Sequence, residues 1–353
     1  MNILSLFDGK SSGYTALELI GITPSNYYSA EIDKYAIKVS NAIHPNQTRL
    51  GDVTKWREWD IDWRNIDLIL GGFPCQAWSM AGKQMGDKDE RGMLFWTMLD
   101  IMKEVRKHNP NADFLIENVK MKKEFEEYIT HHTEQALGEV HKILINSALV
   151  SAQNRNRYYW TSWKNEQPED KGIHINEILE IPGRVGAMRG RYIVDGKRAD
   201  HTVSSQAGKT EQRIEMRKDS KTNTLTTVTK DNLVVDEKFF VSQKQIDRID
   251  LSQVVDGGAR VCFQSPGQNI EKSECLQARD YKGISGRQYF TVAMVNGRLR
   301  KLTPKEYFRL QTVPEHYIDK ILSCGVSNTQ LYKIAGNGWT DEVIAHLLKA
   351  RFA

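Results

Sequence analysis

The sequence predicts an α/β fold with a largely parallel sheet, and two observations lead to this prediction. Short apolar runs of strand length recur at residues 2–7, 27–32, 68–70 and 114–116. The segments after the first two runs, YTALELIG and DKYAIKVSNAI, have apolar residues at helical spacing. Alternation of strands with helices favours parallel pairing, because a crossover helix brings the chain back to the same end of the sheet.

Length and composition set the class of protein. The chain has 353 residues, of which 40% are hydrophobic and 27% are charged, with a net charge of +4. This amounts to roughly two domains of ordinary globular composition, which excludes a disordered or collagen-like chain. No stretch of apolar residues is long enough to span a membrane, and the amino terminus lacks the features of a signal peptide. We therefore expect a cytoplasmic protein without membrane contact.

The four cysteines are too few and too scattered for a disulfide framework, and none forms a C-x-x-C pair. We accordingly expect no metal site. A cysteine with a special role in this chain is more readily explained by chemistry than by structure.

Polar residues follow the predicted strands at their carboxyl ends. Asp8-Gly9 and Gly13 come after the first strand and Glu31 ends the second, as in folds that bind nucleotide-like cofactors. A plain strand-to-helix turn and a solvated carboxylate at a helix start are the alternative interpretations. Because ligands bind beyond the carboxyl ends of parallel strands, we expect one crevice. Its expected polar residues are Asp8, Glu31, Asp52, Cys75 and Glu117.

Three further motifs carry candidate catalytic side chains. In GGFPCQ, Cys75 follows a strand and comes directly after a proline, which suits a presented nucleophile better than a core residue. Glu117 also stands at a strand end, where its carboxyl could donate a proton. Arg155 and Arg157 in QNRNR have the period-two spacing of one strand face. The alternative for the arginines is a solvated edge strand.

The middle of the chain has a different character. After about Trp163, short strand-like pieces rich in Thr, Gly, Ser and basic residues predict a smaller, β-rich domain. Residues 182–235 contain 11 Lys and Arg against 6 Asp and Glu, a net charge of +5. Helical patterns return after Arg300, where Thr303 and Pro304 predict a helix start. We thus divide the chain into residues 1–164, 165–297 and a return segment, 298–353, that completes the first domain.

Taken together, the motifs resemble the cytosine C5 DNA methyltransferase family of phages and bacteria. The matching segments are LFDGKSSG, GGFPCQAWSMAG, ENV, QNRNR, RKLTPKEYFRLQ and QLYKIAGNGW, in the family's order. The resemblance implies a Rossmann-like, S-adenosylmethionine-dependent methyltransferase, with a target-recognition domain between residues 165 and 297. It also implies double-stranded DNA as the substrate.

The resemblance assigns roles residue by residue. Cys75 would add to C6 of cytosine, Glu117 would protonate or hydrogen-bond N3, and Arg155 and Arg157 would orient the base. The residues expected to bind S-adenosylmethionine are Phe7, Asp8, Gly9, Lys10, Gly13, Glu31, Ile32, Asp52, Val53, Pro74, Asn337 and Trp339.

Cytosine inside a duplex is out of reach, so the resemblance implies that the base is flipped out of the helix. Residues 76–91 would form a mobile loop that closes over the DNA. The residues expected to contact DNA are Gln76, Ser79, Arg91, Lys221 and Thr226. A monomer is expected, and a cognate restriction endonuclease, where one exists, would not be bound to it.

Two positions depart from the family pattern. The last motif has Gly338-Trp339 where many members have a small polar residue and valine, a variant that resembles the vertebrate de novo branch. The first motif has Lys10 where small or apolar residues are usual. Lys10 could point to solvent or pair with the methionine carboxylate of the cofactor, or contact a DNA phosphate. It could also accept carboxy-S-adenosylmethionine, which would make the chain a cytosine carboxymethyltransferase.

Two other functions remain open from the residues. An RNA cytosine C5 methyltransferase shares the same motifs, although the long basic middle segment favours duplex DNA. A catalytically silent DNA-binding protein would have no need for Cys75, Glu117, Arg155 and Arg157 together.

Overall fold

A computed structural model describes residues 1–74, 93–173, 177–178 and 303–353, together with the backbone of short strands between residues 184 and 301. The chain divides into two compact units. One contains Met1–Ile173 and Tyr307–Ala353, and the other contains His174–Glu306. Within the described residues, none of the helices combines the length and the apolar character needed to cross a membrane.

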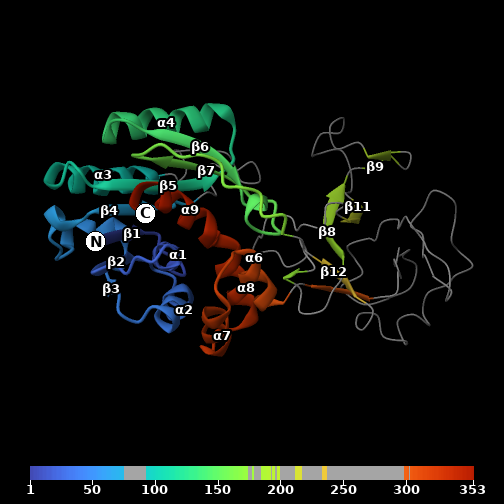
Figure 1. Cartoon of the computed structure of the whole chain (residues 1–353). Coiled ribbons are helices and arrows are strands. Elements are labelled where there is room, and N and C mark those ends of the chain that lie inside the picture. The colour runs from blue at the N-terminus through green and yellow to red at the C-terminus, as the bar shows by residue number, and fades with distance from the viewer. Residues whose placement is uncertain are drawn as a thin grey trace, which may run out of the picture. The chain divides into compact units, whose positions relative to one another are not determined.

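The first unit is built on a seven-stranded sheet in the order β3-β2-β1-β4-β5-β7-β6 (Figure 1). The strands are β1 (Asn2–Leu6), β2 (Asn26–Ala30), β3 (Thr48–Arg49), β4 (Leu68–Gly71), β5 (Asp113–Val119), β6 (His141–Asn146) and β7 (Asn156–Thr161). The first five strands in this order pair in parallel, and β7 alone among the described strands of this sheet runs in the opposite direction, antiparallel to both β5 and β6. The predicted α/β class with a mostly parallel sheet is confirmed.

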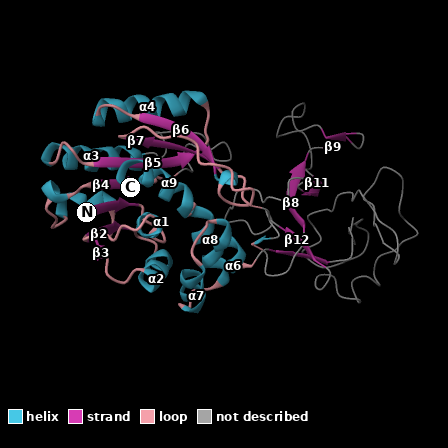
Figure 2. Ribbon diagram, in the orientation of Figure 1, coloured by secondary structure: helices cyan, strands magenta, loops and turns pink. Residues whose placement is uncertain are grey.

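Helices cover both faces of this sheet (Figures 1 and 2). Apolar residues of α3 (Met93–His108) and α4 (Lys123–Leu137) pack on one face, and those of α1 (Ser12–Leu19) and α9 (Asp341–Phe352) pack on the other. The remaining α-helices described are α2 (Lys34–Ile43), α6 (Pro304–Leu310), α7 (Glu315–Ser323) and α8 (Asn328–Asn337). Short 3-10 helices are η1 (Val53–Glu58), η2 (Trp63–Asn65) and η5 (Ser147–Leu149).

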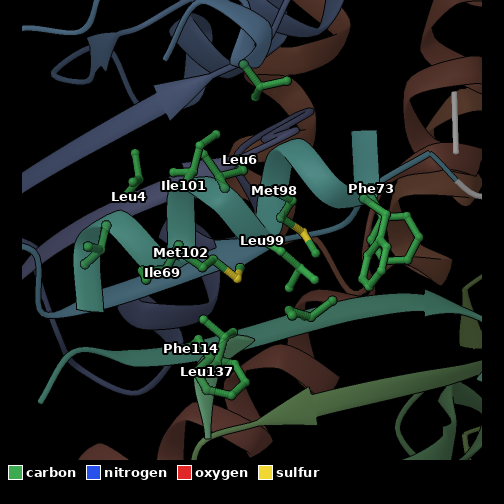
Figure 3. Packing of buried hydrophobic residues seen from close by; sticks show 14 of the residues in the cluster. Leu4, Leu6, Ile69, Phe73, Met98, Leu99, Ile101, Met102, Phe114 and Leu137 are labelled. Atoms are coloured by element: carbon green, nitrogen blue, oxygen red, sulfur yellow. The ribbon is translucent and has the colours of Figure 1, made fainter. Parts of the chain in front are cut away.

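The strand residues alternate between the two cores. Leu4 and Leu6 of β1 and Ile69 of β4 pack beneath α3, as Figure 3 shows, while Ile3 and Leu70 belong to the core on the α1 and α9 side. Because both faces are buried, the strands read as continuous apolar runs rather than as alternating ones. This is why these runs were visible in the sequence.

The described strands of the second unit pair antiparallel. A four-stranded sheet has the order β11-β8-β12-β13, and β9 pairs with β10. The strands are β8 (Arg184–Arg191), β9 (Ile193–Val194), β10 (Lys197–Arg198), β11 (Glu211–Met216), β12 (Leu233–Asp236) and β13 (Arg298–Lys301). The β-rich character expected for this part of the chain holds for these strands. Its role in target recognition stays a prediction.

Gly13 lies where α1 approaches the sheet most closely. A Cβ atom at this position would stand 2.2 Å from Cδ1 of Leu70 and 2.9 Å from the hydroxyl of Tyr27. Both neighbours are buried, so neither has room to move aside. The glycine that the sequence assigned to a cofactor turn is therefore also required by helix-to-sheet packing.

We predict that Gly13→Ala lowers the free energy of unfolding by about 1–3 kcal/mol, the usual cost of overpacking a core. Leu70→Ala also costs stability, because it empties a buried site, but the losses of the two single variants should add up to more than the loss of the double variant, because Leu70→Ala removes the nearer clashing atom. Denaturant unfolding of the two single variants and the double variant measures the coupling. Strictly additive losses would contradict the packing explanation.

Candidate functional site

The strand order reverses between β1 and β4. Polar residues gather at the carboxyl-terminal edge of the sheet, where these parallel strands end. The chain runs from β1 outward to β2 and β3 and then returns to β4 on the other side of β1. A switch of this kind leaves a crevice beyond the carboxyl ends of the strands. The segments that follow these ends are residues 7–10 after β1, 31–32 after β2, 72–74 after β4, and Glu117 near the end of β5.

The turn between β1 and α1 is held by a buried carboxylate. Phe7, Gly9 and Ser11 have φ angles of 56°, 58° and 64°, so every second residue is left-handed. Asp8 accepts hydrogen bonds from four hydroxyl groups, those of Ser5, Ser11, Tyr27 and Ser29, at 2.5–2.8 Å. Burial, together with Asp8, raises the pKa of Tyr27 well above its usual value, so its hydroxyl remains a donor. The Asp8 side chain thus stabilises the turn itself.

Glu31 joins this turn to the end of β2. Its carboxylate accepts the backbone N–H groups of Gly9, Ile32 and Asp33, each at 2.8 Å. The neighbouring Ile32 is 73% exposed, although it is a large apolar side chain. A fixed carboxylate beside an exposed apolar side chain is suited to a ligand with a polar sugar and an apolar ring.

Asp52 and Val53, which follow β3, differ from each other in exposure. Asp52 accepts the backbone N–H of Thr54 and so caps η1, and its side chain is only partly buried. Val53 is buried within the core on the α3 side of the sheet. Its side chain therefore faces the core, and the expected contact of Val53 with the cofactor stays a prediction.

Glu117 is held at both of its carboxylate oxygens. Nε of Arg157 lies 2.9 Å from Oε1, and the indole Nε1 of Trp339 donates to Oε2 at 3.0 Å. The Glu117 side chain is about nine-tenths buried. Next to it, Asn118 donates to the carbonyl of Phe73 at 3.1 Å and ties β5 to the segment that leads to Pro74.

The two arginines of QNRNR are used differently, which the period-two spacing did not indicate. Arg157 lies on β7 and contacts Glu117. Arg155 precedes this strand, is buried, and donates to the carbonyls of Gly336 at 3.2 Å and Gly338 at 2.9 Å. Arg155 therefore fixes the end of α8. The alternative of a solvated edge strand is wrong, because Arg155 is buried and β7 lies between β5 and β6, and the role of both arginines in orienting the base stays a prediction.

Lys10 is fully buried and forms an ion pair with Asp341, the first residue of α9. Its Nζ lies 2.5 Å and 2.7 Å from the two carboxylate oxygens, and both side chains are 0% exposed. Burial lowers the pKa of Lys10 and raises that of Asp341, and their mutual attraction opposes both shifts.

Burial contradicts the interpretation of Lys10 as a solvent-facing side chain, and an enclosed ammonium does not reach a DNA phosphate. The ammonium donates to both oxygens of the Asp341 carboxylate. Contact of Lys10 with a carboxylate of the cofactor, or the use of carboxy-S-adenosylmethionine, stays a prediction.

The return segment carries the last two expected residues to the same edge. Asn337 ends α8 and is exposed. Trp339 lies against Gly72, where a Cβ atom would stand 2.8 Å from the indole nitrogen. Pro74, the last residue described before a gap, follows directly. Cys75, Gln76, Ser79, Arg91, Lys221 and Thr226 lie outside the described residues.

Several residues that hold the site were missed by sequence reasoning. Gln311 donates to the carbonyls of Ala335 at 2.6 Å and Gly338 at 3.1 Å and accepts from Thr340 at 2.9 Å. Gln153 donates to the carbonyl of Leu310 at 3.0 Å. These partners are distant in sequence, so local patterns give no signal for them. Asp341 is equally hidden, because an acidic residue at a helix start is ordinary.

Comparisons with known proteins show which family this chain matches. The family model described as C-5 cytosine-specific DNA methylase matches residues 1–352. The Type II methyltransferase M1.ScrFI of Lactococcus lactis subsp. cremoris is 32% identical over 318 residues, which cover 88% of this chain and 67% of that protein. The orphan methyltransferase M.SPRI of Bacillus phage SPR is 26% identical over 434 aligned positions, covering 99% of this chain and 97% of that protein.

Solved structures share the fold at lower identity. The Entamoeba histolytica methyltransferase EhMeth aligns with a TM-score of 0.61 and 15% identity, covering 99% of this chain and 97% of that one. A mutant of Spodoptera frugiperda DNMT2 aligns with a TM-score of 0.59 and 20% identity, covering 100% of this chain and 99% of that one.

We predict that Lys10→Met lowers the free energy of unfolding by about 3–5 kcal/mol, because it leaves the Asp341 carboxylate buried without its partner. The double variant Lys10→Met with Asp341→Leu should recover most of that loss, since it removes both buried charges. Chemical denaturation of cofactor-free protein measures all three variants. A double variant no more stable than Lys10→Met would show that the pair itself contributes the stability.

Proposed function

The chain belongs to the C-5 cytosine-specific DNA methylase family, and we propose that it methylates C5 of cytosines in double-stranded DNA. The observation that carries the proposal is the position of the Glu117 carboxylate. It is held by Arg157 and Trp339 beside the Gly72-Phe73-Pro74 segment that leads to Cys75. A fixed acid next to a presented thiol is the arrangement that addition to a pyrimidine ring requires.

The family uses S-adenosylmethionine as its cofactor, and the residues at the switch point fit it. Glu31 would accept hydrogen bonds from the ribose hydroxyls, and the exposed side chain of Ile32 would cover the adenine. The main chain of residues 7–9, the partly buried Asp52 and the exposed Asn337 would complete the pocket. When bound, the cofactor supplies an electrophilic methyl group on a sulfonium.

Cytosine C5 is too weak a nucleophile to take a methyl group unaided. The Cys75 thiolate would therefore form a bond to C6, which places negative charge on the ring. Glu117 would stabilise this charge by donating a proton or a hydrogen bond to N3. The electron-rich C5 would then bond to the methyl carbon that the cofactor supplies, and the sulfur would leave with the bonding electron pair as a thioether. Loss of the C5 proton to a base and expulsion of Cys75 from C6 return the aromatic ring and the thiolate.

Duplex DNA is the substrate that we favour for three reasons. The family is described as a DNA methylase, the relatives include a type II and a phage methyltransferase, and residues 182–235 carry a net charge of +5. The target base would be flipped into the crevice. Residues 76–91 would close over the DNA, and Gln76, Ser79, Arg91, Lys221 and Thr226 would contact it. We propose a monomer without a bound restriction endonuclease, acting in the cytoplasm of a bacterial or phage-infected cell.

Transfer of a labelled methyl group from S-adenosylmethionine tests this function directly. Purified protein should label duplex DNA from a host without cytosine methylation, at mapped sites, and should leave transfer RNA unlabelled. Labelling of transfer RNA with none on duplex DNA would overturn the choice of substrate.

We predict that Cys75→Ser loses methyl transfer and keeps cofactor affinity, because the thiol acts on the base and not on the sulfonium. Wild-type protein should be trapped covalently on DNA that contains 5-fluorocytosine, since fluorine cannot leave as a proton does. Cys324→Ser is the matched control: Cys324 caps α7 and is partly buried, and its replacement should leave transfer intact. Normal turnover by Cys75→Ser would exclude the thiol as nucleophile.

We predict that Glu117→Gln slows the chemical step by about 100-fold to 10,000-fold, the range for loss of acid–base catalysis. The amide keeps the size of the side chain but cannot deliver a carboxyl proton to N3. Single-turnover transfer at saturating DNA measures the step, with exposed Glu127→Gln on α4 as the control. An unchanged single-turnover rate would show that another group activates N3.

A further inference from the structure

Trp339 contacts Glu117 by a hydrogen bond that most side chains at this position could not form. Its indole nitrogen donates to Oε2 at 3.0 Å, and the other oxygen, Oε1, is occupied by Arg157 at 2.9 Å. Two donors, each on its own oxygen, fix the plane of the carboxyl group. Many members of the family that the sequence resembles have valine at this position, and a valine side chain has no hydrogen-bond donor.

The indole ring is itself held in place. It packs on Gly72, whose missing side chain allows the ring to approach: a Cβ atom would lie 2.8–3.2 Å from three indole atoms. The chain is fixed on both sides of Trp339 in the sequence. Before it, the carbonyl of Gly338 accepts hydrogen bonds from Arg155 and Gln311, and after it, Asp341 forms an ion pair with Lys10. The donor therefore points at Glu117 because buried contacts orient the ring.

The face of the sheet explains why these groups meet. Leu70 of β4 and Leu115 of β5 both pack into the core on the α9 side. Side chains alternate along a strand, so the residues two positions further on, Gly72 and Glu117, belong to this face as well. Trp339 comes from the junction of α8 and α9 above it. One ring can therefore cover the strand end before Cys75 and bind the carboxyl group on the neighbouring strand.

We propose that Trp339 is a positioning residue that acts through Glu117, by holding its carboxyl group in the orientation needed at N3 of cytosine. This rests on the function proposed above and adds to the expected role of Trp339 in the cofactor pocket. An indole N–H only donates, so it neither supplies nor removes the proton itself. Its contribution is a hydrogen bond in a buried setting, which fixes the orientation of the Glu117 carboxyl group before the base arrives.

A double-mutant cycle on single-turnover methyl transfer tests the proposal. Trp339→Phe keeps a ring over Gly72 and removes the donor, and it should slow transfer by about tenfold, as expected for the loss of one buried hydrogen bond. In the Glu117→Gln background the same change should alter the rate by less than about twofold, because the carboxyl proton whose delivery Trp339 orients is already gone. The affinity for S-adenosylmethionine should stay within about twofold in all variants.

Trp163→Phe is the matched control, since it also removes an indole donor, but one that binds the carbonyl of Leu347 and Oδ1 of Asn165 instead of Glu117. It should leave the rate unchanged in both backgrounds. Equal slowing by Trp339→Phe with and without Glu117→Gln would overturn the proposal. So would an unchanged rate combined with weakened cofactor binding, which would make Trp339 a cofactor residue only.

An activity-independent measurement separates this proposal from the function on which it rests. Denaturant unfolding of wild type, Trp339→Phe, Glu117→Met and the double variant without cofactor should give a coupling, because each change removes one partner of the buried hydrogen bond between Trp339 and Glu117. If wild-type protein methylates neither DNA nor RNA, the proposed function fails, and a clear coupling still supports the contact. Additive losses of stability would overturn the contact whatever the activity.

Discussion

A buried ion pair between residues 331 positions apart holds the functional edge together. Lys10 stands in the turn after the first strand, and Asp341 opens the last helix. The pair fixes where α9 begins relative to this turn, and the residues just before Asp341 therefore reach the carboxyl ends of β4 and β5. The positions of Trp339 and Glu117 relative to each other depend on this constraint.

Burial of two charges is an expensive way to join two segments, because desolvation works against both ionised forms. An apolar contact could hold the two segments as firmly, but it would tolerate a shift of one residue in the position of α9 relative to the turn. The ion pair accepts one register, since Nζ must meet both oxygens of Asp341. Hydrogen bonds of Gln311 and Arg155 to the carbonyl of Gly338 specify the same register from the other side. We interpret this polar network as a device for precise placement.

The sequence allowed the central strands to be predicted because they are buried on both faces and read as apolar runs. The first run was expected to extend to Phe7, but β1 ends at Leu6, since Phe7 takes a left-handed conformation. The two-residue β3 is too short to leave a pattern. Glu117 could be identified from its motif, whereas its contacts with Arg157 and Trp339 could not, because register and long-range docking decide them. Lys10 was misjudged for the same reason: its partner lies at the far end of the chain.

The glycines before Cys75 illustrate how one motif can serve packing and chemistry together. A Cβ atom on Gly71 would lie 2.7 Å from the sulfur of Met98 on α3, and one on Gly72 would lie 2.8 Å from the indole of Trp339. Consecutive residues face opposite sides of the sheet, so the two glycines allow close approach from both sides at once. The end of β4 is thereby clamped between α3 and Trp339 just before the chain continues to Pro74 and Cys75. A strand end held in this way fixes the position of the backbone from which the chain continues to the proposed nucleophile. We take this to be the physical reason for the paired glycines.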